Sequence, residues 1–165
     1  MEIRDCDLKK LFELPKCDHA IRSISWSPDS RLLAMASGDR VSVVDVATGK
    51  EMLRLRGHNG AVFCVMYSAA GKSIVTCGDD GAIVFHDAMT GEVRCRLFGH
   101  EGRVNDLSLA QNAHLLASAG DDGTVRLWPL ASAAEVESQT SARPLVIDEN
   151  EPGFANGHAS KSEKP

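Results

Sequence analysis

Hydrophobic and polar residues alternate in short runs along the chain, and turn-forming residues bound each run. Such runs cover Val62 to Tyr67, Ser73 to Cys77, Ala82 to His86 and Glu92 to Phe98. Period-two alternation over about six residues is typical of β-strands, and the Gly, Asp, Asn and Ser clusters between the runs predict turns. The chain is therefore predicted to be all-β and to consist of four-stranded antiparallel units.

The pattern repeats with a period of about 42 residues. Gly57-His58 recurs as Gly99-His100, and Gly78 to Gly81 recurs as Gly120 to Gly123. An earlier and more divergent copy begins at Cys17. Three four-stranded units at this period predict the blades of a β-propeller.

The third copy resembles the WD-repeat family in the order of its residues. Gly99-His100 is followed by Leu116-Ala117-Ser118 and then by the stretch from Asp122 to Trp128. The resemblance covers roughly Cys17 to Pro129 and is weakest in the first copy. It implies WD40-type β-propeller blades, and three copies make the chain a partial or shortened member with an incomplete propeller, because closed propellers have about four to eight blades.

The predicted organisation follows these copies. It comprises an N-terminal segment at 1–16 with an outer, closing strand, a degenerate repeat at 17–56, repeats at 57–98 and 99–130, and a disordered tail at 131–165. The closing strand is expected in Leu8 to Leu14, and the third copy is expected to lack its outer strand. The apolar and acidic cluster from Pro144 to Glu151 is interpreted either as an unstructured spacer or as a motif that orders on a partner.

The resemblance also implies a hydrogen-bond network inside each blade. An aspartate accepts from a histidine, the histidine contacts a hydroxyl on the second strand, and an indole N–H on the third strand reaches the same hydroxyl. Such a chain satisfies polar groups that would otherwise be buried without partners. The third copy carries all four residues, namely His100, Ser118, Asp122 and Trp128. The second copy carries His58, Thr76 and Asp80, with His86 in place of the tryptophan. The first keeps only Asp39, with Cys17, Met35 and Val44 elsewhere.

The residue types of this network also fit two chemical alternatives, a hydrolase triad and a metal site. His100, Asp122 and Ser118 have the residue types of a hydrolase triad, but Ser118 lies in the middle of a predicted strand and not on an exposed turn beside oxyanion donors. His58 and His86 lack further ligands at metal-binding spacing. We therefore expect no enzymatic activity, no metal and no cofactor.

Composition limits the partners and the compartment. The chain of 165 residues is 43% hydrophobic and 5% aromatic with a formal net charge of -5, which argues against nucleic acid as the partner. Its apolar runs are shorter than the roughly 20 residues of a membrane span, and no signal peptide opens it. Five cysteines without a C-x-x-C pair favour free thiols. The protein is expected to be intracellular, cytoplasmic or nuclear, without membrane association.

The function expected from this architecture is a non-catalytic protein-protein interaction scaffold, a subunit of a larger complex, that docks proteins or peptides on its loop face. Arg103 is the favoured contact, because arginine is enriched at interface hot spots. The other candidates lie in the neighbouring loops and are Asn59, Glu101, Asp79 and Asp121. The two aspartates form an acidic rim that favours a basic peptide.

Three blades leave open strand edges, which allows three explanations. The chain is a truncated, non-functional or regulatory product of a longer WD-repeat protein, or two copies associate head to tail, or another subunit completes the propeller. A ubiquitin-ligase substrate adaptor is a further alternative. Ligase receptors of the family often carry an arginine where this chain has Ala47, Met89 and Ala131, which disfavours that role.

Overall fold

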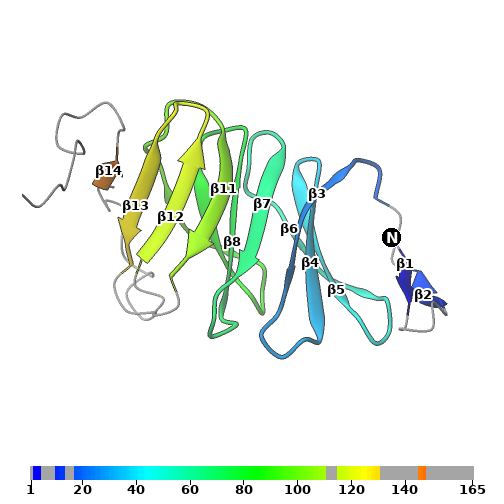
Figure 1. Cartoon of the computed structure of the whole chain (residues 1–165). Helices are drawn as coiled ribbons and strands as arrows, with labels where there is room; N and C mark the ends of the chain where they lie inside the picture. The colour runs from blue at the N-terminus through cyan, green and yellow to red at the C-terminus, as the bar shows by residue number, and fades with distance from the viewer. Residues whose placement is uncertain (1, 5–9, 14–16, 111–114, 131–144, 148–165) are drawn as a thin grey trace, which may run out of the picture.

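The computed structural model describes residues 2–4, 10–13, 17–110, 115–130 and 145–147, and all of its regular elements are β-strands. Three four-stranded antiparallel sheets pack side by side as propeller blades in an open arrangement (Figure 1). The predictions of an all-β fold and of three four-stranded units are confirmed.

Each blade follows the chain in order, from the inner strand to the outer strand. Blade one contains β3 (Ile21–Trp26), β4 (Leu32–Ser37), β5 (Arg40–Asp45) and β6 (Glu51–Leu55). Blade two contains β7 (Val62–Tyr67), β8 (Ser73–Gly78), β9 (Ile83–Asp87) and β10 (Val93–Leu97). Blade three contains β11 (Val104–Leu109), β12 (Leu115–Gly120), β13 (Val125–Pro129) and β14 (Leu145–Ile147).

The turns form where the sequence supplies turn chemistry. Gly81 adopts a φ of 70° in the hairpin between β8 and β9, a conformation that costs glycine no steric penalty. At the next turn, the Asp87 carboxylate accepts the backbone N–H groups of Met89 and Thr90 at 2.7 and 2.8 Å. This side chain closes its own turn and sets the distance between β9 and β10.

The hydrophobic core lies between the blades. Ala34, Ala36 and Val43 of blade one pack against Val65 and Tyr67 of blade two. A second cluster joins blades two and three and contains Val75, Cys77, Ile83, Phe85, Val104, Leu107, Leu116 and Trp128. Each blade therefore depends on its neighbour to cover an apolar face.

Hydroxyl groups add hydrogen bonds across the first of these interfaces. Ser23 Oγ accepts the backbone N–H of Val65 at 3.2 Å, and Ser25 Oγ accepts that of Tyr67 at 3.0 Å. The inner strands of blades one and two are thus held together by polar as well as apolar contacts.

The structure corrects the prediction for the tail. Leu145–Ile147 forms β14 and pairs antiparallel with β13, in the register Val125↔Ile147 and Leu127↔Leu145. The expectation of a tail disordered throughout, and of a third copy without an outer strand, is wrong at these residues. The open edge of β13 offers unpaired backbone groups, and a Leu-Val-Ile triplet has the β-propensity to pair with them. The rest of the tail lies outside the described residues.

The N-terminal strand lies in a sheet of its own. β2 (Lys10–Glu13) pairs antiparallel with β1 (Glu2–Arg4). Within the described part of one chain, β2 therefore does not provide the outer strand of any of the three blades.

Candidate functional site

Blade three contains a continuous hydrogen-bond chain from its loops to its central strands. His100 Nδ1 lies 2.9 Å from Asp122 Oδ2, and His100 Nε2 lies 2.7 Å from Ser118 Oγ. Trp128 donates its indole N–H to the same Ser118 oxygen at 2.9 Å. A neutral imidazole protonated on Nδ1 donates to the carboxylate and accepts from the serine hydroxyl, so every polar group in this chain has a partner.

Asp122 is the anchor of this chain and accepts further hydrogen bonds. The backbone N–H of Glu101 donates to it at 3.0 Å, and the Thr124 hydroxyl donates at 2.8 Å. Burial alone would raise the pKa of Asp122, but the donors, His100 among them, outweigh it and hold that pKa well below its ordinary value. Asp122 is therefore ionised at neutral pH and fixes two loops to the blade.

This arrangement gives Ser118 no access to a substrate. Ser118 is buried, and its oxygen already contacts the imidazole of His100 and the indole of Trp128. A serine nucleophile must reach a substrate carbonyl at an exposed position. The geometry is that of a structural network.

Blade two contains a variant of the same network. His58 Nδ1 lies 2.8 Å from Asp80 Oδ1, and His58 Nε2 lies 2.9 Å from Thr76 Oγ1. His86 Nε2 lies 3.1 Å from the same hydroxyl oxygen, where Trp128 donates in blade three. An imidazole protonated on Nε2 reproduces the indole donor, so the hydroxyl is shared in the same way.

The substitution of histidine for tryptophan has an electrostatic cost. His86 is 1% exposed, and its Nδ1 has no hydrogen-bond partner in the described residues. Burial, together with the neighbouring His58, lowers the pKa of His86 to about 4. His86 is therefore neutral at physiological pH.

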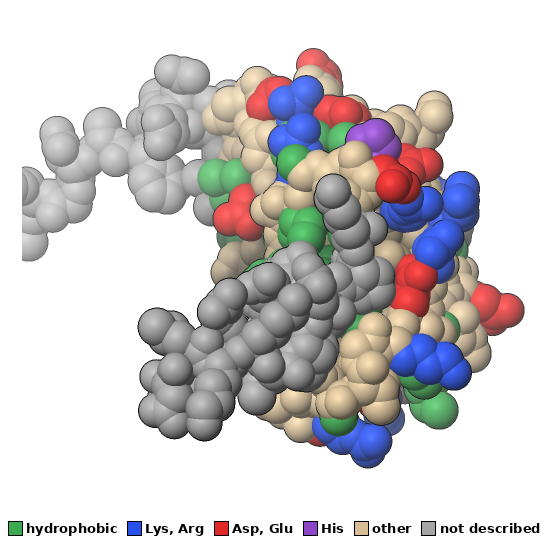
Figure 2. All heavy atoms as spheres, turned by 90° about the vertical axis from the view of Figure 1, so that its right-hand side faces the viewer, with side chains coloured by type: hydrophobic (Ala, Val, Ile, Leu, Met, Phe, Trp, Pro, Cys, Tyr) green, Lys and Arg blue, Asp and Glu red, His purple; other side chains and the backbone are tan. Residues whose placement is uncertain are grey.

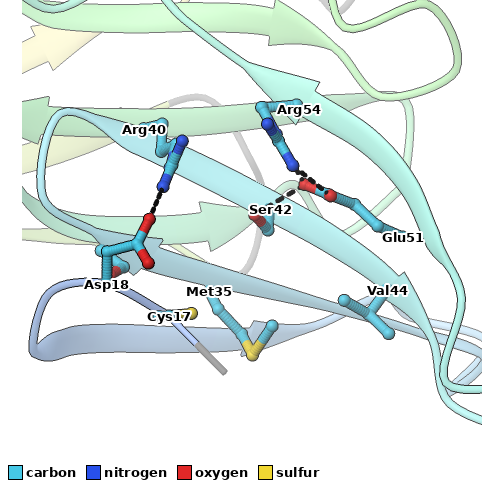
Figure 3. Close-up of a pocket in the computed structure, with 9 residues that line it drawn as sticks. Cys17, Asp18, Met35, Arg40, Ser42, Val44, Glu51 and Arg54 are labelled. Atoms are coloured by element: carbon cyan, nitrogen blue, oxygen red, sulfur yellow. Dashed lines mark hydrogen bonds and ion pairs between the residues drawn. The ribbon is translucent and has the colours of Figure 1, made fainter. Parts of the chain in front are cut away.

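Blade one lacks the network and contains a pocket at the corresponding place. Cys17, Met35 and Val44 occupy the positions of the histidine, the hydroxyl residue and the tryptophan, and Asp39 is exposed. The pocket has a volume of about 190 Å³ (Figure 3). Sequence reasoning did not predict this pocket. The replacement of a tryptophan and a histidine by smaller residues in the first copy could have indicated it, because smaller side chains leave space unfilled.

The five residues predicted to contact partners lie in loops that lead into blades two and three or that join strands within these blades. Arg103 donates to Asp79 at 2.8 Å, and its guanidinium lies 4.4 Å from the centre of the Phe63 ring. Asp121 accepts a hydrogen bond from Asn105 at 2.6 Å. Arg103 therefore links two blades within the chain, and Phe63, which sequence reasoning missed, is its aromatic partner.

The two remaining candidates contribute their backbone. The N–H of Asn59 donates to Asp80 at 2.8 Å, and that of Glu101 donates to Asp122. Both residues are exposed, so their side chains project from loops whose backbone the networks hold in place.

The outer face of blade one, which points away from blade two, is a further surface that sequence reasoning missed. Cross-strand pairing places its side chains on one side of the sheet, and they are Ile24, Trp26, Leu33, Met35, Ser42, Val44, Glu51 and Arg54. Ile24 and Trp26 are large and half exposed. Alignment of the repeats could have indicated this surface, because the residues of blade two that are equivalent to Ile24 and Trp26 lie in the core. They are Val65 and Tyr67.

Two further features of the described residues concern metal ligands and membrane-spanning helices. Nowhere among them do three His, Cys, Asp or Glu side chains come together as metal ligands would. None of them forms a helix that is long and apolar enough to cross a lipid bilayer.

Comparison with family models agrees with the blade geometry. The model described as "WD domain, G-beta repeat" matches residues 91–129, and the model described as "Anaphase-promoting complex subunit 4 WD40 domain" matches residues 2–70. The chain belongs to the WD-repeat family. Members of this family are typically non-catalytic protein-interaction scaffolds, and nothing in the described blades indicates an enzyme.

Curated relatives resemble this chain over a limited extent. It is 33% identical over 69 residues to the human intraflagellar transport protein 122 homolog, and 32% identical over 77 residues to the one from Danio rerio. These segments are 42% and 47% of this chain and 6% of each relative. The similarity thus concerns one to two blades of much longer proteins.

Two solved structures share the fold. "Crystal structure of RRP9 WD40 repeats" superimposes with a TM-score of 0.68 at 23% identity, covering 74% of this chain and 38% of that chain. "Structure of U3-55K" gives a TM-score of 0.71 at 20% identity, covering 81% and 41%. The WD-repeat protein described here thus spans less than half of either chain.

Proposed function

We propose that this WD-repeat protein is a non-catalytic interaction scaffold that joins a larger assembly through the outer face of blade one. The proposal rests on the relation between equivalent positions in the repeats. Ile24 and Trp26 of β3 are 52% and 49% exposed, whereas Val65 and Tyr67 at the same positions of β7 are 2% and 9% exposed. Blade one covers Val65 and Tyr67, and a partner is needed to cover their counterparts.

The other end of the stack supports the same proposal. Val125 of β13 is 43% exposed, whereas Ile83 at the same position of β9 is fully buried against blade three. Both ends of the stack thus carry surfaces that serve as blade interfaces elsewhere in the chain. A partner with an apolar β-sheet face, from a second copy or from another subunit, fits them.

The charges on this end favour a protein partner. Figure 2 views the molecule from the side of blade one, and the acidic and basic side chains that grey atoms do not cover are interspersed there. A phosphate-binding surface would gather one sign of charge. The curated relatives are intraflagellar transport proteins, which also supports a role among proteins.

We assign a second contact to the loops of blades two and three. The side chains of Asp79 and Asp121 are 36% and 53% exposed and flank Arg103. A basic segment of a partner would compete with Arg103 for these carboxylates. The acidic rim would then select the partner, while the outer face of blade one supplies the apolar area.

Site-specific crosslinking in cells tests the proposal. The photoreactive residue p-benzoylphenylalanine replaces Ile24 in the full chain, and in a control it replaces Met89, which is 87% exposed in a turn of blade two. We expect a discrete product from position 24 that is absent from position 89 and is lost in a Trp26→Thr background. Mass spectrometry of the product distinguishes a second copy from another subunit.

Two outcomes of the crosslinking would contradict the proposal. If position 24 crosslinks no more than position 89, the outer face of blade one is not an interface and the proposal fails. A product that persists unchanged in the Trp26→Thr background would equally contradict it, because Trp26 is a large, half-exposed side chain on the same face as Ile24.

A further inference from the structure

The pocket of blade one opens among side chains from four segments of the blade. Met35 comes from β4, Ser42 and Val44 from β5, and Glu51 from β6, while Cys17 precedes β3 (Figure 3). Asp18, Ser37, Arg40 and Arg54 complete the lining. Met35 and Val44 are at most 1% exposed, so these apolar residues form the deepest part of the lining and offer little open surface.

In the other two blades, aromatic side chains occupy positions equivalent to some of those that line this pocket. In blade three the Trp128 indole, which is fully buried, extends from the position that Val44 occupies in blade one. In blade two the His86 imidazole extends from the same position. Cys17 replaces the histidine that precedes the inner strand in the other blades, His58 or His100, and this removes a second ring. The pocket thus lies beside the positions from which these rings extend in the other two blades.

The polar groups of the pocket match an N–H donor. Ser42 donates its hydroxyl hydrogen to Glu51 Oε1 at 2.8 Å, which leaves the lone pairs of Ser42 Oγ free to accept. Arg54 Nε donates to the same Glu51 oxygen at 2.9 Å. The Ser42 oxygen is therefore an oriented acceptor in the pocket, and it lies on β5, across from Met35, which occupies the position of Ser118.

The charges of the pocket are already paired. Arg40 contacts Asp18 at 2.8 Å, and Arg54 contacts Glu51. A charged ligand would have to displace one of these partners, whereas a neutral ring would not. The volume of about 190 Å³ exceeds the roughly 150 Å³ of an apolar cavity that holds benzene, so it has room for a larger ring.

We propose that this pocket binds an indole, the tryptophan side chain of a partner protein, with the indole N–H donated to Ser42 Oγ. The inference rests on the scaffold role proposed above for the source of the tryptophan. The ring would restore in trans the aromatic group that Trp128 provides within blade three, and it would anchor the partner on the outer face of blade one.

Binding of 3-methylindole, the side-chain analogue of tryptophan, tests the site directly. Titration of the full chain is monitored by ligand-observed NMR and by protection of Cys17 from iodoacetamide, with the half-buried Cys95 as the internal control. We expect 3-methylindole to slow alkylation of Cys17 and to leave Cys95 unchanged. The analogue 1,3-dimethylindole, which lacks the N–H, should bind about five- to tenfold more weakly, the worth of one hydrogen bond.

Two variants make the test specific. Val44→Trp fills the pocket from within and should abolish binding, whereas Met89→Trp adds an indole on an exposed turn and should leave binding unchanged. Ser42→Ala removes the acceptor and keeps Met35 and Val44. It should weaken the binding of 3-methylindole about five- to tenfold and leave the affinity for 1,3-dimethylindole unchanged. Ser42→Ala still tests the site if Val44→Trp does not fold.

Three results would overturn the proposal. The first is no protection of Cys17 by 3-methylindole, and the second is equal binding to Val44→Trp and to the wild type. The third is binding of 3-methylindole that Ser42→Ala leaves unchanged, because the indole N–H would then not be donated to Ser42 Oγ. None of these results affects crosslinking from position 24, so a failure of the pocket is distinguishable from a failure of the scaffold role.

Discussion

Trp128 donates its indole N–H to Ser118 Oγ at 2.9 Å, and this bond completes a chain that runs from the loops of blade three into its centre. At the same place in blade two, a buried imidazole meets the hydroxyl of Thr76, and in blade one Met35 replaces the hydroxyl. One molecule thus carries a complete, a modified and an absent version of the same network. The three blades can be compared without a change of fold or of solvent.

Replacement of Asp122 by alanine should destabilise the protein by about 1 to 3 kcal/mol. The change removes the acceptor of His100, of the Glu101 N–H and of Thr124 in a mostly buried place. Asp39, the equivalent residue of blade one, is exposed, so Asp39→Ala should cost less than about 0.5 kcal/mol. Thermal unfolding of both variants measures the difference. Equal shifts would contradict the assignment of the complete network to blade three.

The blades and their networks could be predicted because single residues specify them. An Asp-Gly pair determines a hairpin, and the identities of His100, Ser118 and Trp128 determine which polar groups must meet. Leu145–Ile147 could not be placed in this way. A strand of three residues carries too little pattern, and its partner strand ends sixteen positions earlier in the chain, at Pro129.

The surfaces were harder to predict than the networks, for a different reason. Arg103 was expected to contact a partner, but its ion pair with Asp79 and its stacking on Phe63 depend on how two blades face each other. The pocket of blade one and the exposure of Trp26 arise because side chains or a blade that cover the equivalent positions elsewhere are absent there. Patterns in one copy cannot show them, and comparison of equivalent positions among the copies can.

Gly120 should be far less tolerant of alanine than Gly123, although both lie beside Asp122. A Cβ on Gly120 would lie 2.9 Å from Asp122 Oδ1 and closer still to the His100 ring, so the network must break. A Cβ on Gly123 meets nothing within 4 Å, and only its φ of +74° opposes substitution. We expect a loss of about 2 kcal/mol or more for Gly120→Ala and about 1 kcal/mol for Gly123→Ala in urea unfolding. The reverse order would show that backbone conformation, and not the network, makes this turn require glycine.

Titration of His86 should weaken the fold in mild acid. Its pKa is lowered from 6.5 to about 4 in the folded protein, so the unfolded chain binds more protons between these values. The free energy of unfolding therefore falls as pH decreases from 6.5 to 4, by about 3 kcal/mol at most. Asp122 acts in a lower range. Because its pKa is depressed, its contribution is present above its ordinary value of 3.8 and is lost as pH falls below that value.

Replacement of His86 by tryptophan separates these two ranges. An indole in this place donates to Thr76 as Trp128 donates to Ser118, it leaves no orphan nitrogen, and it does not titrate. The free energy of unfolding of His86→Trp, measured by urea denaturation between pH 7 and 4, should therefore be nearly flat, while its loss below pH 4 should remain as in the wild type. Met89→Trp, which adds an indole on an exposed turn and changes no titratable group, should keep the wild-type slope. A slope between pH 6.5 and 4 that survives in His86→Trp would mean that groups other than His86 carry the acid sensitivity of blade two.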